Sequence, residues 1–337
     1  MNGPQVGVVV IGRNEGRRLR LCLQSLIKHD AIVVYVDSGS TDGSPADARA
    51  VGADVVELDM SIPFSAARAR NAGFERLMSR RPNTEFVQFV DGDCEMFDDW
   101  LATASGILSS RDELAVAAGR LHERHRDATV YNRLCDIEWD LPLGEVQECG
   151  GIFMIRASTF NDVGGFNIQL VAGEEPDLCF RLRTAGWIVW RHDGDMAWHD
   201  AAISHFGQWC KRSVRTGYAF ADVAWRHLRS PGRFSLRPVI SILLWALVIP
   251  LMAVIPVWWT YGFSLLLLLL YPVQVWRIAR RQIRDGRDSA DSWVNARFMV
   301  LGKFPQLIGV FRFFRKRLLR QQSTIIEHKD SAPTGSA

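Results

Sequence analysis

The stretch Glu85-Phe86-Val87-Gln88-Phe89-Val90-Asp91-Gly92-Asp93 decides the fold of this chain. Its β-branched and aromatic run predicts a buried strand that ends in two carboxylates one residue apart. Gly92 allows the backbone to turn between them. Two hard oxygen ligands at the carboxyl end of a strand suit Mg²⁺ or Mn²⁺, which in turn binds a diphosphate. For the triplet alone, an Asp-Gly turn that closes a hairpin is the alternative.

Strands and helices alternate on the way to this stretch. Apolar runs and helical spacing predict strands at residues 6–11, 31–36, 55–58 and 85–90, and helices at residues 17–29, 45–51 and 64–78. This alternation predicts an α/β domain with a mostly parallel sheet and right-handed crossovers. Such sheets bind ligands at the carboxyl ends of their strands. Glu15, Asp37 and Asp91 all fall at such ends, so we expect them in one site.

The second half of this domain has a less regular pattern. Strands are expected at residues 114–119 and 187–190, and helices at residues 128–140, 157–163 and 174–185. Gly186 is the expected stop of the last helix. Trp139 and Trp190 are expected in the core, and His199 is expected to follow the last strand.

The composition excludes several classes of protein. The chain has 337 residues, 48% of them hydrophobic, and a net charge of +3, which predicts one or two domains with a large core. Its basic residues gather around one apolar stretch rather than over a folded face, which argues against a nucleic-acid partner. Its six cysteines include no Cys-x-x-Cys pair, which argues against a zinc site or a disulfide scaffold and favours a reducing cytoplasm.

The segment from Val239 to Trp276 contains no charged residue. One transmembrane helix needs about 20 residues, so this segment can hold two with a tight connection. Pro256 and the pair Trp258-Trp259 lie near its middle, where a turn and interfacial aromatic residues are expected. Arginines flank both outer ends, which predicts a membrane hairpin with both ends on the cytoplasmic side. A buried core helix or a re-entrant pair is the alternative. The flanking arginines are Arg226, Arg229, Arg233 and Arg237 before the segment, and Arg277, Arg280, Arg281, Arg284 and Arg287 after it.

Residues 293–320 alternate aromatic and aliphatic side chains with basic ones. A basic amphipathic segment of this kind lies on an anionic membrane surface, and packing against the folded domain is the alternative. The small polar residues at the end of the chain predict a disordered tail. The predicted organisation is a catalytic domain at residues 1–225, a membrane hairpin with basic flanks at 226–290, amphipathic interfacial helices at 291–325 and a disordered tail at 326–337.

Four motifs follow one another along the first domain. They are Val9-Val10-Ile11-Gly12-Arg13-Asn14-Glu15, Tyr35-Val36-Asp37-Ser38-Gly39-Ser40-Thr41-Asp42-Gly43-Ser44, Asp91-Gly92-Asp93 and Gly173-Glu174-Glu175-Pro176-Asp177-Leu178-Cys179-Phe180-Arg181-Leu182. In this order they resemble the family 2 glycosyltransferases with the GT-A fold, over roughly residues 5–220. The resemblance implies a Rossmann-like, mostly parallel sheet flanked by helices, followed in this chain by the transmembrane hairpin and the amphipathic helix.

The resemblance also implies an activity. It implies an inverting, metal-dependent glycosyltransferase that moves one sugar from a nucleotide-diphospho-sugar to an acceptor hydroxyl, with Mg²⁺ or Mn²⁺ as cofactor. A bilayer anchor favours a lipid-linked or polysaccharide acceptor, contact with membrane lipids, and a place at the cytoplasmic (inner) membrane with the catalytic domain facing the cytoplasm.

Two other functions stay open. A membrane-tethered, non-catalytic nucleotide-sugar-binding or scaffold protein would be expected to lack Asp93 or the acids at 174, 175 and 177, which this chain keeps. A sugar nucleotidyltransferase needs a glycine-rich loop with a basic residue after the first strand, and only Gly12-Arg13 stands there.

The resemblance assigns several residues to the nucleotide. Glu15 and Asp37 would hold its base and ribose, because carboxylates accept hydrogen bonds from N–H and hydroxyl groups. For Glu15 the alternative is a helix N-terminal acid favoured by the macrodipole. Arg68 and Asn71 are implied contacts from the helix at 64–78, whereas Arg70 fits a solvated face nearly as well.

The resemblance assigns the metal to the acidic triplet and a late histidine. Asp93 would bind the ion directly, and Asp91 would contact the ribose or a metal-bound water. His199 would complete the metal site, with Asp200 orienting its ring.

The last motif carries the implied catalytic base. A single displacement needs a base beside the acceptor hydroxyl, opposite the leaving diphosphate. The family usually has Glu-Asp where this chain has Glu174-Glu175, and its second acid is the base. Glu175 is therefore the first candidate and Asp177 the second. Gly150 and Gly151 precede the strand that feeds this site, and their bare backbone would let a sugar approach closely.

Overall fold

The computed structural model describes residues 5–29, 31–229 and 236–319. Contacts divide the described chain into two compact units, one made of residues 5–125 and 138–202 and the other of residues 126–137 and 203–319. The sequence placed the end of the first domain at residue 225, whereas the contacts divide the chain at residue 202. The predicted tail at 326–337, residues 320–325 and Arg233 lie outside the described residues.

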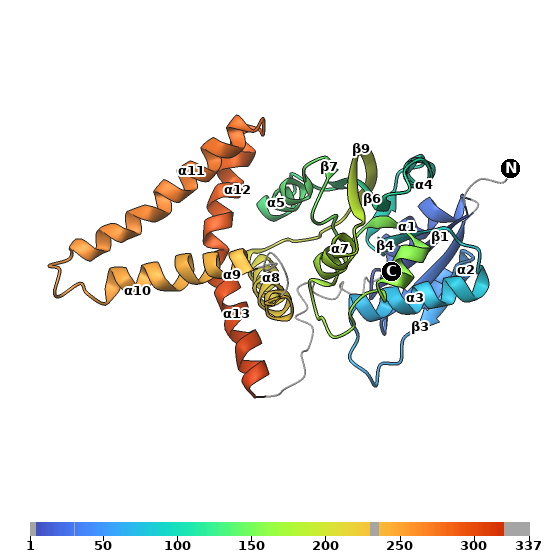
Figure 1. The fold of residues 1–337 in the computed structure, drawn as a ribbon, viewed down its shortest axis with the longest axis horizontal. Coiled ribbons are helices and arrows are strands. Elements are labelled where there is room, and N and C mark those ends of the chain that lie inside the picture. Colours follow the sequence, from blue (N-terminus) through green and yellow to red (C-terminus); the bar gives the residue numbers. More distant parts are fainter. Residues whose placement is uncertain (1–4, 30, 230–235, 320–337) are drawn as a thin grey trace. The chain divides into compact units, whose positions relative to one another are not determined.

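The first unit is built on a nine-stranded mixed sheet (Figure 1). The strand order is β3-β2-β1-β4-β8-β6-β9-β5, and β7 pairs with β9. Strands β1 to β4 run parallel, as the sequence predicted, and β8 enters between β4 and β6 antiparallel to both. The strands are β1 Val6–Gly12, β2 Ile32–Asp37, β3 Asp54–Glu57, β4 Phe86–Asp91, β5 Cys94–Met96, β6 Leu114–Glu123, β7 Gly144–Glu145, β8 Phe153–Arg156 and β9 Ile188–His199.

Helices cover both faces of this sheet and form two cores (Figure 1). One core joins Val8 and Val10 of β1 to Leu23 of α1 and Trp100 of α4. The other joins Val9 to the helices of the opposite face. Adjacent residues of one strand therefore serve opposite cores, as expected for a strand buried on both faces. The helices are α1 Arg17–Ile27, α2 Ser44–Ala50, α3 Ala66–Arg80, α4 Trp100–Ser110, α6 Ala157–Asp162 and α7 Glu174–Thr184. The predicted α/β class is confirmed.

The structure corrects the prediction at several points. The hairpin alternative for Asp91-Gly92-Asp93 is wrong, because β4 pairs with β1 and β8 and not with β5. Gly92 does not have a positive φ; a Cβ there would lie 3.2 Å from the carbonyl oxygen of Ile11, so close approach explains the glycine.

The strands of the second half are longer than predicted. β6 extends to Glu123 and β9 to His199, so the histidine ends a strand instead of following it. Trp139 and Trp190 are half-buried rather than core residues. The elements β5, α4 and β7 were not predicted.

The second unit is helical. Its helices α8 Phe206–Arg226 and α13 Lys303–Leu318 cross through glycines, since a Cβ on Gly217 would lie 2.0 Å from the carbonyl oxygen of Gln306 and one on Gly309 would lie 2.1 Å from that of Val214. One face of α13 is therefore buried against α8 of the same unit.

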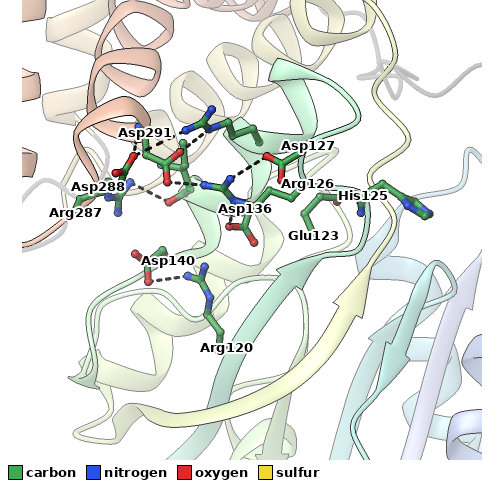
Figure 2. Close-up of polar contacts among 12 residues, drawn as sticks. Arg120, Glu123, His125, Arg126, Asp127, Asp136, Asp140, Arg287, Asp288 and Asp291 are labelled. Atoms are coloured by element: carbon green, nitrogen blue, oxygen red, sulfur yellow. Dashed lines mark hydrogen bonds and ion pairs between the residues drawn. The ribbon is translucent and has the colours of Figure 1, made fainter.

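Ion pairs join two further elements of this unit. Arg126 and Arg133, from the segment that leads into and forms α5 (Val130–Trp139), pair at 2.5 and 2.6 Å with Asp291 of α12 (Ser289–Leu301). Figure 2 shows Arg126 between Asp136 and Asp291.

Two helical runs of the second unit, Leu236–Val254 and Phe263–Arg284, are long and apolar enough to cross a membrane by length and composition. The first run comprises α9 (Leu236–Leu243), a π-helical turn (Leu244–Val248) and α10 (Ile249–Val254). Pro250, which lacks an N–H, follows the π-helical turn and removes one regular helical hydrogen bond there. The second run comprises a 3₁₀ segment (Phe263–Leu269) and α11 (Leu270–Arg284). Residues 255–262 connect the two runs, as the positions of the proline and the tryptophans predicted.

Candidate active site

Three acidic residues lie where neighbouring strands end. In the parallel ladders, Gly12 of β1 pairs with Asp37 of β2, and Ile11 pairs with Asp91 of β4. The carboxyl ends of β2, β1 and β4 therefore stand side by side, and the loop after β1 carries Glu15. This is the edge of the sheet at which the sequence predicted a site.

The carboxylate of Asp37 is buried and fixed by its own loop. The backbone N–H groups of Gly39 and Ser40 donate to its Oδ2 at 2.9 and 2.8 Å, and the Tyr35 hydroxyl donates to Oδ1 at 2.8 Å. Asn14 joins the loops after β1 and β2, because its N–H donates to Ser40 and its side chain accepts from the Thr41 N–H. These bonds hold Asp37 in one orientation.

Glu15 lies beside the acidic triplet. A Cβ on Gly92 would lie 3.4 Å from Glu15 Cγ, and Arg18 pairs with the Glu15 carboxylate at 2.7 Å. The backbone approach at Gly92 thus brings the loop after β1 against the loop after β4.

A buried arginine gathers the acids of this edge. Arg70 of α3 is 3% exposed, and its guanidinium donates to Asp91 and Glu174, both at 2.8 Å, and to the Gly151 carbonyl at 3.2 Å. Burial alone would lower the pKa of Arg70, but the two carboxylates outweigh it and raise the pKa above its ordinary value. A Cβ on Gly151 would lie 3.2 Å from this guanidinium and 3.4 Å from Asp91, so the glycine makes room for the pair.

The two other residues expected on this helix contact loops. Arg68 donates to the carbonyls of Ile62 and Asp59 at 2.8 and 2.7 Å. Asn71 donates to the Phe166 carbonyl at 2.8 Å and accepts from the Phe166 N–H at 2.9 Å. The structure therefore brings Arg70, rather than Arg68 or Asn71, to the acids at the strand ends.

Asp93 meets His199 across β5 and β9. Its carboxylate is buried and lies 3.5 Å from His199 Nε2, while Glu123 Oε2 lies 3.9 Å from Nδ1. The Trp139 ring packs on the imidazole with centroids 4.5 Å apart. Asp200, expected to orient the ring, instead donates its backbone N–H to the Asp93 carbonyl at 3.1 Å.

The donors around His199 fit a divalent ion. Asp93, Cys94 and His199 each offer one atom within 4.8 Å of the others. His199 Nδ1 is buried without a hydrogen-bond partner among the described residues. A carboxylate oxygen and an imidazole nitrogen are ligands that Mn²⁺ accepts, and Mg²⁺ accepts the carboxylate.

Glu175 of α7 is buried under the loop that leads to β8. Its Oε1 accepts from the Cys149 N–H at 2.7 Å, from Cys179 Sγ at 3.1 Å and from Cys149 Sγ at 3.3 Å. Burial, and then the charge of Glu148, raise the pKa of Glu175 to about 7. A carboxyl that titrates near neutral pH is suited to accept a proton.

The second base candidate has a structural partner. Asp177 is 2% exposed and pairs with Arg181 at 2.9 Å, and Arg181 also donates to the carbonyls of Val163 and Gly165. Gly150 has a φ of +89° and lies open, since a Cβ there would meet nothing within 4 Å. These contacts favour Glu175 over Asp177 as the group that can exchange a proton.

Residues 7–158 match the family model described as glycosyl transferase family 2. This segment, which is just under half of the chain, is similar to that family. The match spans β1 to the start of α6 and includes Glu15, Asp37, Asp91 and Asp93.

Individual proteins also resemble parts of this chain. A pre-mycofactocin glycosyltransferase of Mycobacterium tuberculosis is 28% identical over 235 residues, which cover 66% of this chain and 48% of that protein. This chain thus spans about half the length of the curated relatives it matches. The solved mannosyltransferase PcManGT from Pyrobaculum calidifontis, in complex with GDP-Man and Mn²⁺, superposes with a TM-score of 0.60 at 16% identity, over 93% of this chain and 88% of that one. At this identity the likeness supports the fold alone.

Sequence reasoning left two residues out of the candidate site. For Arg70, which lies one residue before the predicted contact Asn71, a nucleotide contact and a solvated face both stayed open, and it was not assigned to the site. Glu123 lies four residues beyond the predicted end of its strand, and only the longer β6 brings it to His199. In both cases the partners are distant in sequence, so local patterns carry no signal for them.

Proposed function

We propose that this protein is an inverting, metal-dependent glycosyltransferase that transfers a sugar from a nucleotide-diphospho-sugar to an acceptor hydroxyl. One observation carries the proposal: Arg70 joins Asp91, at the end of β4, to Glu174 and to the Gly151 carbonyl beside the candidate base. The groups that we propose for the donor and for the acceptor are therefore linked by one side chain, which supports a shared site.

The donor would lie over the ends of β1, β2 and β4. Glu15 and Asp37 would accept hydrogen bonds from the base and ribose, with Arg68 and Asn71 acting through the loops they hold. The mannosyltransferase of similar fold is described in complex with GDP-Man and Mn²⁺, which supports a donor of this class.

Asp93 and His199 would hold the metal ion, with Asp91 nearby. When bound, a divalent ion acts as a Lewis acid that neutralises the charge of the leaving diphosphate. Glu123 lies against the other nitrogen of the histidine and would orient the ring.

Glu175 would act as the base. The acceptor hydroxyl attacks the anomeric carbon from the side opposite the diphosphate, the bond to the diphosphate breaks, and the hydroxyl proton moves to Glu175. One displacement inverts the configuration at that carbon. The bare backbone of Gly150 and Gly151 would leave room for the sugar.

The second unit would attach the enzyme to a membrane. Its two apolar runs have the length of membrane spans, and the arginines that flank them favour the cytoplasmic side. An enzyme held there lies beside lipid-linked and growing glycan acceptors, which we propose as its acceptor class.

The test is turnover of sugar nucleotides by the full chain in detergent. With Mn²⁺ or Mg²⁺, we expect nucleotide release from one member of a panel of UDP-, GDP- and TDP-sugars, and loss of release on chelation. Asp93→Ala should abolish release, whereas Asp98→Ala, which changes an exposed aspartate in the same region, should not. If no sugar nucleotide is turned over while one still binds, the protein is a binding or scaffold protein and the proposal is wrong.

A further inference from the structure

Arg191 of β9 is a buried cation with almost no compensation. It is 3% exposed, and its one hydrogen bond within the described chain runs from Nη2 to the Trp139 carbonyl at 2.8 Å. Its Nε is buried and meets no acceptor in residues 5–29, 31–229 and 236–319. Over the same residues, it forms no ion pair.

The charged neighbour with the larger effect on Arg191 is another arginine. Arg120 of β6, the strand paired with β9, repels it, and burial and then this repulsion lower the pKa of Arg191. Asp140 raises the pKa of Arg191, but it forms its ion pair with Arg120, at 2.7 Å. The side chain of Asp140 is 55% exposed. Figure 2 shows Arg120 reaching from β6 to Asp140.

A buried guanidinium without a carboxylate is costly, and a like charge beside it adds to the cost. Arg70 shows the ordinary solution in the same unit, because it is equally buried but pairs with two carboxylates. The missing compensation at Arg191 is what an anionic ligand supplies.

Two neighbouring residues connect Arg191 with the candidate site. Trp139, whose carbonyl accepts from Arg191, packs its ring on His199. Cys149, whose N–H donates to Glu175, lies near enough to Arg191 that a thiolate there would raise the pKa of the arginine. Trp139 therefore connects the arginine with the candidate metal ligand, and Cys149 lies between it and the candidate base.

We propose that Arg191 and Arg120 bind a phosphate group carried by the acceptor. This inference rests on the proposed function, whose acceptor it makes an anion. The planar guanidinium presents parallel N–H donors that match two oxygens of a phosphate. The exposed Asp140 then exchanges its place on Arg120 for the ligand. A lipid phosphate and a soluble phosphate ester share this chemistry.

Phosphate binding tests the site without turnover. Inorganic phosphate is titrated calorimetrically into the full chain in detergent, with chelator and without sugar nucleotide. We expect Arg191→Gln and Arg120→Gln to weaken binding roughly tenfold or more, since each removes a charge-assisted contact. Arg80→Gln, which changes an exposed arginine paired with Asp54, should leave phosphate binding unchanged. No binding, or equal binding by all variants, overturns the proposal.

Stability separates a ligand site from a structural role. Without phosphate, Arg191→Gln should keep or raise the Tm, by roughly 2–4 °C, because it removes an uncompensated buried charge. With phosphate, the wild type should gain stability and the variant should not. A lower Tm of the variant without phosphate shows that Arg191 serves the fold and overturns the proposal.

Kinetics separates the acceptor from the donor. A polyprenyl monophosphate in micelles, glycerol phosphate in solution and the matching neutral alcohols are compared as acceptors. We expect one phosphorylated acceptor to be preferred over its alcohol, and Arg191→Gln to raise the KM for that acceptor roughly tenfold with an unchanged donor KM. A change in donor KM alone assigns the pair to the leaving diphosphate and overturns the inference. An enzyme that turns over no sugar nucleotide contradicts the proposed function, while the calorimetry still decides whether phosphate binds.

Discussion

Arg70 and Arg191 are equally buried, at 3% exposure, yet their surroundings differ. Arg70 sits in a closed set of partners, with Asp91, Glu174 and a carbonyl around its guanidinium. Arg191 has a single carbonyl and a second arginine. The comparison shows that the burial of a charged side chain does not by itself reveal its role, because the partners around it differ. Arg70 is neutralised by carboxylates of the protein itself, whereas we propose that Arg191 is neutralised by an anionic ligand.

The largest effect is expected from a change of the proposed base, Glu175, which follows Glu174, a partner of Arg70. Glu175→Gln keeps the shape and the hydrogen bond from the Cys149 N–H but cannot accept a proton. We expect kcat to fall roughly 10²–10⁴-fold, as for the loss of a general base. Steady-state nucleotide release measures it, with Glu113→Gln as a partly exposed control. A fall of less than about fivefold, beside a large fall for Asp177→Asn, would assign the base to Asp177.

The next effect is on stability, and it should differ between the two arginines. Arg70→Gln leaves Asp91 and Glu174 without their counterion. We expect the free energy of unfolding to fall by about 3 kcal/mol. This is at the low end for buried ion pairs, because Asp91 is 34% exposed. Denaturant unfolding of the full chain in detergent measures it. Equal stability of Arg70→Gln and Arg191→Gln would remove the contrast on which the comparison depends.

The pH dependence of stability should reveal the buried carboxyl. The pKa of Glu175 is raised from 4.5 to about 7 in the folded protein, so the folded state binds the proton more tightly than the unfolded chain. Its contribution is therefore complete below pH 4.5 and is lost as the pH rises toward 7, by at most about 1.4 kcal/mol per pH unit. Glu175→Gln should flatten this slope. The acid limb of kcat/KM should rise through the same range, and an identical slope in the variant would contradict the assignment.

The smallest expected effect is the coupling between Arg70 and its second acid. In a cycle of Arg70→Gln and Glu174→Gln, the double variant should be more stable than the sum of the single losses predicts, by roughly 0.5–3 kcal/mol. The pair Arg49 and Glu57, both more than half exposed, offers a matched cycle with a coupling near zero. Equal couplings for the two pairs would show that Arg70 does not act as a buried clamp.

Much of the fold could be predicted because it depends on local pattern. The apolar runs at 6–11 and 31–36 have the period of buried strands, and their order fixes the parallel half of the sheet together with Asp37 and Asp91 at its edge. The antiparallel insertion of β8 and the extended ends of β6 and β9 have no such pattern. They depend on pairing between distant segments.

The candidate site, like the fold, could be predicted where it depends on local pattern. Acids that follow strands are visible in the sequence, as Glu15, Asp37 and Asp91 were. Arg70 and Glu123 gain their meaning from partners elsewhere in the chain, such as Glu174 and His199. Arg191 stands out only because it has few polar partners in the folded structure, and no local sequence pattern predicts this.

The most direct measurement is pulsed EPR of Mn²⁺ bound to the full chain with a nucleoside diphosphate. The central claim places the ion between Asp93, His199 and the diphosphate. It predicts both ¹⁴N coupling from an imidazole and ³¹P coupling from the nucleotide, with the nitrogen signal lost in His199→Ala and the ion lost in Asp93→Ala. Bound Mn²⁺ with ³¹P coupling but no ¹⁴N coupling, or Mn²⁺ binding that Asp93→Ala leaves unchanged, would contradict it.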